Sequence, residues 1–259
     1  MDFKDKVVLI TGASSGIGKE TAIQFAKKGS KVILVARRKQ KLEELANDLK
    51  KFNVSILVCE CDVSDKLQVE KTSKLVLEKY GSIDILINNA GFAIYGSVFD
   101  LTTEEIESQM ATNYFGMIYF IKNFLPAMLQ KKSGHIVNVA SVAASFGLPG
   151  IASYCASKFA MLGFSEGLKH ELKGTGVTVT ALCPGPVATE FAQVAGFGGS
   201  KMFEGAASAQ KTALKAYKAM EKGKTIFISE LQFTFLIKVL MPFMPTSITA
   251  AIIAKMQQS

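Results

Sequence analysis

Two residues four positions apart, Tyr154 and Lys158, could carry acid–base chemistry in the stretch SYCASKFAM at 153–161. Residues four apart on a helix lie on the same face, so the phenol and the ammonium group would stand side by side. A free phenol has a pKa of about 10, but a neighbouring cation favours the phenolate and lowers that pKa. The pair therefore predicts a tyrosine that exchanges protons near neutral pH, with packing of the lysine stem along the ring as the alternative.

Apolar strands and helices alternate along the chain and would position such a pair. Strands are predicted at 6–10, 31–36, 55–60, 83–88, 135–140, 177–182 and 225–229, and helices at about 16–28, 39–51, 65–79, 103–131 and around Tyr154. The strands are continuously apolar, which indicates that helices cover both faces of the sheet. Repeated strand–helix units with short connections predict a single α/β domain with a doubly wound parallel sheet of about seven strands.

A glycine-rich turn, TGASSGIG at 11–18, joins the first predicted strand to the first helix. Gly12 would allow a tight turn, Gly16 would let backbone approach a ligand, and Gly18 would let the helix pack closely on the sheet. The helix N-terminus offers free N–H groups and positive potential to a pyrophosphate. The glycine spacing departs from the common dinucleotide fingerprint, so a turn that binds no ligand is the alternative.

The end of the second predicted strand carries cations where a site for NAD(H) usually has an acid. Ala36 holds that position, and Arg37 and Arg38 follow it. A carboxylate would repel a 2′-phosphate, whereas guanidinium groups bind one with charge-assisted hydrogen bonds. The pattern favours NADP(H) over NAD(H). The alternative is a solvated basic helix start, which Lys39 and Lys41 support.

Composition argues against several other classes of protein. The chain has 259 residues, 49% of them hydrophobic, and its formal charge of +8 is spread out without interleaved aromatic residues, so nucleic-acid binding is not expected. Cys59 and Cys61 have no nearby histidine, and His135 and His170 have no metal-like or triad-like company, so no metal site is expected. The cysteine pattern and the absence of a signal-peptide-like run at the N-terminus predict a cytoplasmic protein.

Several motifs in order resemble the short-chain dehydrogenase/reductase family over nearly residues 5 to 190. They are TGASSGIG at 11–18, CDV at 61–63, NNAG at 88–91, Asn113, Ser141, YCASK at 154–158 and PGPVAT at 184–189. The resemblance implies a Rossmann-like fold with a site for NADP(H). Together with the two arginines, the predicted cofactor-binding residues are Gly12, Ser14, Ser15, Gly16, Ile17, Gly18, Arg37, Arg38, Asp62, Val63, Asn89, Ala90, Gly91, Tyr154, Lys158, Pro184, Gly185, Val187 and Thr189.

The resemblance also implies roles within the set. Asp62 and Val63 would hold the adenine, and the loop with Asn88, Ala90 and Gly91 would close beneath the nicotinamide side. PGPVAT would line the nicotinamide, with Thr189 able to bond its carboxamide or the phosphates.

Four residues are predicted to be catalytic: Asn113, Ser141, Tyr154 and Lys158. Tyr154 would protonate the alkoxide that forms when a carbonyl accepts hydride, and Lys158 would tune the phenol and also bind the nicotinamide ribose. Ser141 would donate a hydrogen bond to the carbonyl oxygen. The region of Asn113 would hold a water that relays protons to Lys158, unless Asn113 is an ordinary buried amide bonded to backbone.

These expectations describe an NADPH-dependent oxidoreductase that interconverts a carbonyl compound (a ketone, aldehyde or 3-oxoacyl group) with its alcohol. Apolar side chains are placed around the substrate by their position after the motifs: Phe92, Ile94, Tyr95, Phe146, Leu148, Phe191 and Phe197. They predict an apolar substrate. A non-catalytic NADP(H)-sensing protein on the same fold is the alternative, because a fold does not assign a function.

Within the single domain 1–259, residues 1–140 are predicted to bind mainly the cofactor and 141–259 to carry catalysis and the substrate, with a flap at 190–220. The apolar segment 231–256 is predicted to form a subunit interface or a lid, in preference to an interfacial membrane contact. The resemblance further implies a homodimer or homotetramer.

Overall fold

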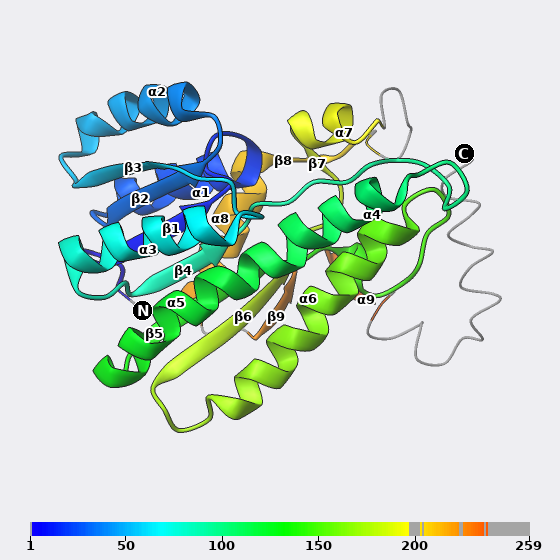
Figure 1. Cartoon of the computed structure of the whole chain (residues 1–259). Coiled ribbons are helices and arrows are strands. Elements are labelled where there is room, and N and C mark those ends of the chain that lie inside the picture. Colours follow the sequence, from blue (N-terminus) through cyan, green and yellow to red (C-terminus); the bar gives the residue numbers. More distant parts are fainter. Residues whose placement is uncertain (1, 197–202, 204, 223–224, 236, 238–259) are drawn as a thin grey trace.

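Seven strands form one parallel sheet in the order β3-β2-β1-β4-β5-β6-β9 (Figure 1). They are β1 Val7–Thr11, β2 Lys31–Ala36, β3 Ile56–Glu60, β4 Ile85–Asn88, β5 Gly134–Val139, β6 Val177–Cys183 and β9 Ile226–Ile228. The structure is a computed structural model that describes residues 2–196, 203, 205–222, 225–235 and 237. The predicted doubly wound α/β fold with about seven parallel strands is confirmed.

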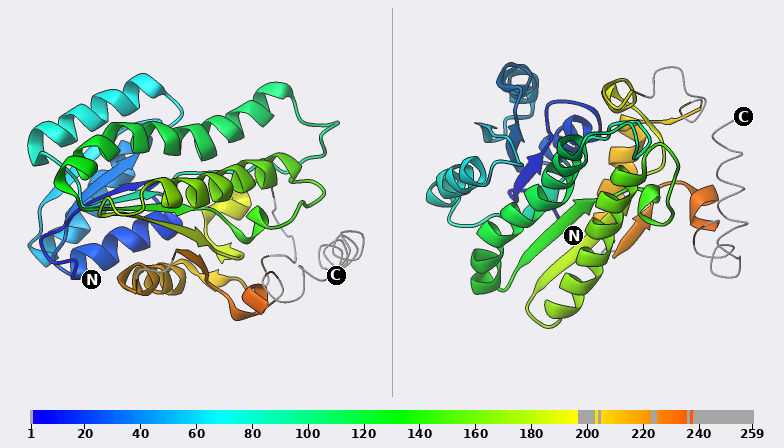
Figure 2. Two further views of the ribbon diagram at one scale, coloured as in Figure 1. Left: turned by 90° about the horizontal axis from the view of Figure 1, so that it is seen from below. Right: turned by 45° about the vertical axis from the view of Figure 1, so that its right-hand side comes forward.

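Helices cover both faces of this sheet, as the continuously apolar strands predict. On one face lie α1 (Gly16–Lys27), α2 (Lys39–Leu49) and α8 (Ala209–Glu221); on the other lie α3 (Lys66–Tyr80), α5 (Gly116–Lys131) and α6 (Ala152–Glu171). Val8 and Ile10 of β1 pack on the first set, and Val7 and Leu9 on the second. Figure 2 (left) shows the cyan and green helices and the blue and orange helices on opposite sides of the strands.

The order of the strands reverses between β1 and β4. From β1 the chain proceeds outward through β2 to β3, and it then returns to place β4 on the other side of β1. The connections after these two neighbouring strands therefore run to opposite sides, which leaves an opening beyond their carboxyl ends. The glycine-rich turn follows β1 and the NNAG stretch follows β4, so both predicted motifs border this opening.

The region after β6 forms a second layer over the same edge. β7 (Val187–Ala188) pairs in parallel with β8 (Ala207–Ser208), and α7 (Glu190–Val194) lies between them in the chain. The predicted flap 190–220 thus includes α7, β8 and most of α8, whereas 197–202 and 204 lie outside the described residues. That this region acts as a flap, and that the roles divide at residue 140, stay predictions.

The predicted apolar segment 231–256 begins with α9 (Leu231–Phe235). Apart from residue 237, the rest of the segment lies outside the described residues, so its role stays a prediction. Within the part of the chain that the structure describes, no helix is both long and apolar enough to cross a membrane.

A buried histidine in the sheet predicts a loss of stability in acid. His135 of β5 has its Nε2 2.8 Å from Thr180 Oγ1, and burial lowers its pKa from 6.5 to about 4. Between pH 6.5 and pH 4, His135 is protonated in the unfolded chain but neutral in the folded chain. The free energy of unfolding therefore falls as the pH drops through this range. The full loss is about 3 kcal/mol.

Chemical denaturation across this pH range should show a shallower decline for His135→Gln than for the wild type, because glutamine can still bond Thr180 but does not titrate. His170→Gln is the matched control, since His170 is exposed. If the profile of His135→Gln followed that of the wild type, burial of His135 would not be the cause.

Candidate active site

The glycine-rich turn forms a cradle that larger side chains would fill. Gly12 has φ +64°, and a Cβ there would lie 2.8 Å from Asn89 Nδ2. A Cβ on Gly18 would run into the Gly12 carbonyl and lie 2.5 Å from the same amide nitrogen. Only glycine therefore lets α1 approach the turn and the NNAG loop this closely. Gly18 packs the helix in this way but does not itself line the cavity described below.

Hydrogen bonds tie the end of β1 to the loop that follows β4. Thr11 Oγ1 accepts bonds from the backbone N–H groups of Asn89 (2.9 Å) and Ala90 (3.0 Å). Asn89 Nδ2 donates to the Thr11 carbonyl oxygen at 3.0 Å. These bonds hold the two motifs at the border of the opening in a fixed relation to each other.

The N-terminus of α1 has the properties of an anion site. Its N-cap, Ser15, has an extended backbone and makes no side-chain capping bond, and the first turn holds no acidic residue. The N–H groups of this turn are therefore free of a side-chain cap. Arg38 adds positive charge: its guanidinium donates to Ser14 Oγ (3.0 Å) and Ser15 Oγ (2.8 Å). This donor set fits a pyrophosphate.

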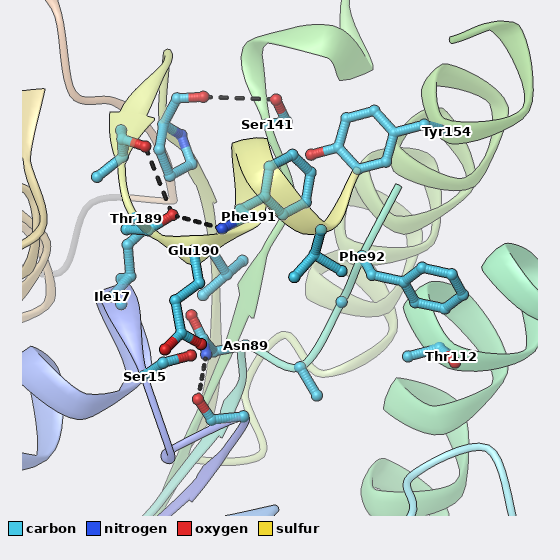
Figure 3. A pocket seen from close by; sticks show the side chains of 18 of the residues that line it. Ser15, Ile17, Asn89, Phe92, Thr112, Ser141, Tyr154, Thr189, Glu190 and Phe191 are labelled. Atoms are coloured by element: carbon cyan, nitrogen blue, oxygen red, sulfur yellow. Dashed lines mark hydrogen bonds between the residues drawn. The ribbon is translucent and has the colours of Figure 1, made fainter. Parts of the chain in front are cut away.

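The predicted acid–base pair lies at the other end of the opening. The Tyr154 hydroxyl points towards Ser141 (Figure 3), and the Ser141 hydroxyl donates to the Pro184 carbonyl at 3.5 Å. Ser141 begins a short 3-10 helix, Val142–Ala144, and its Oγ accepts a bond from the Ala143 N–H at 3.1 Å. The ring of Tyr154 packs against Phe191 of α7, with 5.6 Å between centroids.

Burial sets the protonation of this pair. It raises the pKa of Tyr154 above its ordinary value of 10, and the nearby Ser141 hydroxyl opposes this shift only in part. Burial also lowers the pKa of Lys158 to about 8. The prediction that the pKa of Tyr154 is lowered is therefore wrong in direction: the Lys158 ammonium lies 5.7 Å from the centre of the phenol ring and donates to the Val139 carbonyl at 2.9 Å.

Asn113 lies behind the cavity in a π-helical turn, Ala111–Phe115, between α4 (Thr103–Met110) and α5. Its Oδ1 accepts from the Phe92 N–H at 2.9 Å, and its Nδ2 donates to the Phe92 carbonyl and to Ser157 Oγ, each at 2.9 Å. Ser157 Oγ in turn donates to the Tyr154 carbonyl at 2.7 Å. The amide is thus fully engaged, as the alternative interpretation predicts, and the water relay stays a prediction.

A single cavity of about 390 Å³ joins the two ends of the opening. All predicted catalytic and cofactor-binding residues line it except Gly18 and Asn113; Asn88 of the predicted nicotinamide loop does not line it and instead donates to Asn138 Oδ1 at 2.9 Å. Arg37 and Arg38 stand at its outer end, where Arg37 Nη1 lies 3.7 Å from Asp62 Oδ2. Motifs more than a hundred residues apart in the chain therefore meet in one continuous site.

Only some of the predicted substrate residues line the apolar end of this cavity. Phe92, Leu148 and Phe191 line it, whereas Ile94, Tyr95 and Phe146 do not, and Phe197 lies outside the described residues. The cavity-lining residues that sequence reasoning missed here include Thr112, Ala143, Ile151, Val194 and Phe203. No motif marks them, because only the folded chain brings these elements to Tyr154.

Two glutamates near the site were also missed. Glu190 lines the cavity and bonds Arg38. Glu230, just before α9, accepts a bond from the Gly185 N–H at 2.8 Å and so supports the PGPVAT stretch. Each glutamate is far from its partner along the chain, so no local sequence pattern reveals these pairs.

The family model described as short chain dehydrogenase matches residues 6–196. The chain belongs to this family. One relative in the family, a dehydrogenase/reductase SDR family protein 7-like of Anopheles gambiae, is 37% identical over 84% of this chain and 72% of its own length.

Solved structures of family members share the fold. A short-chain dehydrogenase/reductase from Burkholderia phymatum, in complex with NAD, has a TM-score of 0.86 and 25% identity, covering 92% of this chain and 94% of that one. A short-chain dehydrogenase from Sphingobium yanoikuyae, in complex with NADPH, has a TM-score of 0.83 and 30% identity, covering 91% and 92%. Members of the family with this fold thus bind either dinucleotide.

Proposed function

We propose that this family member is an NADPH-dependent oxidoreductase that interconverts an apolar carbonyl compound and its alcohol. The observation that carries the proposal is the buried Tyr154, whose hydroxyl points towards Ser141 at the apolar end of a cavity that continues to the uncapped N-terminus of α1. In this proposal the hydroxyl is the proton donor, and the cavity between it and α1 holds the dinucleotide.

The residues present fit a nicotinamide dinucleotide. The cradle at Gly12 and the uncapped α1 N-terminus would hold the pyrophosphate, and Asp62 and Val63 would hold the adenine. Arg37 and Arg38, with Ala36 in place of an acid, favour a ribose 2′-phosphate and hence NADP(H). When bound, the cofactor supplies or accepts the hydride.

The side chains at the apolar end would supply the proton for the alkoxide and stabilise the negative charge on the carbonyl oxygen. Ser141 would donate a hydrogen bond to the carbonyl oxygen and stabilise the negative charge that develops there. Because burial raises its pKa, Tyr154 stays protonated at neutral pH and is suited to give a proton to the nascent alkoxide.

The lining of this end supports an apolar substrate. Ala143, Leu148, Ile151 and Phe203 line it, and their side chains are hydrocarbon. A sugar would lose its hydrogen bonds to water there without regaining them. A ketone or aldehyde with an apolar body has one polar atom, the carbonyl oxygen, which Ser141 and Tyr154 would hydrogen-bond.

The test is a spectrophotometric assay of NADPH consumption across a panel of apolar ketones, aldehydes and acyl thioesters, repeated with NADH. We expect turnover with NADPH on at least one apolar carbonyl compound and weaker activity with NADH. Tight NADPH binding without turnover on the whole panel would favour the alternative, a non-catalytic sensor. The predicted homodimer or homotetramer, the cytoplasmic location and the absence of nucleic-acid partners stay predictions.

A further inference from the structure

Glu190 forms an ionic bridge across the mouth of the cavity. It is the first residue of α7 and directly follows Thr189. Its Oε2 accepts from Arg38 Nη1 at 2.7 Å, and its Oε1 accepts from Lys41 Nζ at 2.8 Å. Both cations belong to the start of α2, about 150 residues earlier in the chain. The bridge therefore connects α7 to the part of the chain that is predicted to bind the cofactor.

The same guanidinium also contacts the glycine-rich turn. The Nε and Nη2 atoms of Arg38 donate to the hydroxyl groups of Ser14 and Ser15, while Nη1 donates to the Glu190 carboxylate. Figure 3 shows the Glu190 side chain reaching from α7 towards Ser15. The Glu190 carboxylate thus occupies donors that a phosphate bound at this end of the cavity would need.

The charge of Glu190 is permanent under ordinary conditions. Hydrogen bonds from Lys41 and Arg38 lower the pKa of its carboxyl to about 2. All three side chains are more than 40% exposed, so solvent and salt screen the bridge and it can exchange partners readily. A phosphate monoester carries roughly −1.5 to −2 charges near pH 7 and outcompetes one carboxylate for the same cations.

We propose that Glu190 is a specificity-determining residue that competes with the ribose 2′-phosphate of NADP(H) for Arg38 and Lys41. It thereby lowers the affinity for NADP(H) while leaving the affinity for NAD(H) almost unchanged, because NAD(H) has no group that needs these donors. The inference rests on the proposed function in so far as the cavity binds a nicotinamide dinucleotide. It does not depend on which of the two dinucleotides the wild type prefers.

The test compares Glu190→Gln with the wild type by calorimetric titration with NADPH and with NADH. We expect the Kd for NADPH to fall about three- to tenfold and the Kd for NADH to stay within about twofold. Glu44→Gln is the matched control: Glu44 is an exposed glutamate of α2, and its replacement changes the net charge equally. Its two affinities should stay within about twofold of the wild type.

A second comparison places Glu190→Gln in an Arg38→Gln background. Because the competition acts through Arg38, the gain in NADPH affinity should shrink there, and an undiminished gain would overturn the proposal. An equal gain for NADPH and NADH would also overturn it, since it would place Glu190 in competition with the pyrophosphate that both share.

The two proposals fail in different ways. If the wild type bound neither dinucleotide, the proposed function would be wrong and this inference with it. If the wild type bound them and Glu190→Gln left the ratio of the two affinities unchanged, only this inference would be wrong.

Discussion

Replacing Tyr154 by phenylalanine is expected to lower kcat by about 10³-fold or more and to leave the affinity for NADPH within a few-fold. The variant loses the hydroxyl that meets Ser141 but keeps the ring that packs on Phe191. Without the phenol, the nascent alkoxide has no positioned proton donor, while the cradle around α1 is untouched. Steady-state kinetics and calorimetric titration with NADPH measure the two quantities separately.

The control for this variant is Tyr119→Phe, which removes a hydroxyl from a half-buried tyrosine of α5 outside the cavity. We expect its kcat to match that of the wild type. Full activity of Tyr154→Phe would remove Tyr154 from the mechanism, and equal losses in both variants would point to a general effect on folding.

Gly18→Ala is expected to damage both folding and cofactor binding. The added methyl group would run into the Gly12 carbonyl and lie 2.5 Å from Asn89 Nδ2, which itself donates to Thr11. Neither neighbour can move without distorting the cradle, so we expect a loss of about 1–3 kcal/mol in the free energy of unfolding. The displaced turn should weaken NADPH binding by about tenfold or more. Chemical denaturation and calorimetric titration measure these effects.

Gly167→Ala provides a control of opposite sign. Gly167 lies in α6 with no atom beyond its own helix near its Cβ position. Alanine is favoured over glycine inside a helix by about 0.5–1 kcal/mol, so this variant should be slightly more stable and should bind NADPH normally. A Gly18→Ala protein as stable as Gly167→Ala would show that the turn tolerates a side chain.

The glycine-rich turn shows how much of the site local sequence could predict. The spacing of Gly12, Gly16 and Gly18 after an apolar run was enough to place a cradle between the first strand and the first helix. The structure confirms the turn and the close packing. The continuously apolar runs likewise predicted a parallel sheet covered on both faces, because a strand that is buried on both faces has apolar residues at successive positions.

The protonation of Tyr154 could not be predicted in the same way. The spacing to Lys158 indicates that both side chains lie on one helix face, but not how deeply the fold buries them. Burial turned the expected lowering of the pKa into a rise, because desolvation penalises the phenolate more than a lysine 5.7 Å from the ring centre stabilises it.

Short segments of the sequence therefore encode the strand and helix types, the turn glycines and the helix that carries Tyr154 and Lys158. The partners of Asn113, the bridge from Glu190 to Arg38 and the residues around the apolar end of the cavity emerge only when the chain is folded. The physical reason is that such hydrogen bonds, ion pairs and desolvation depend on groups far apart in the chain, whose meeting is set by packing of the whole sheet and its helices.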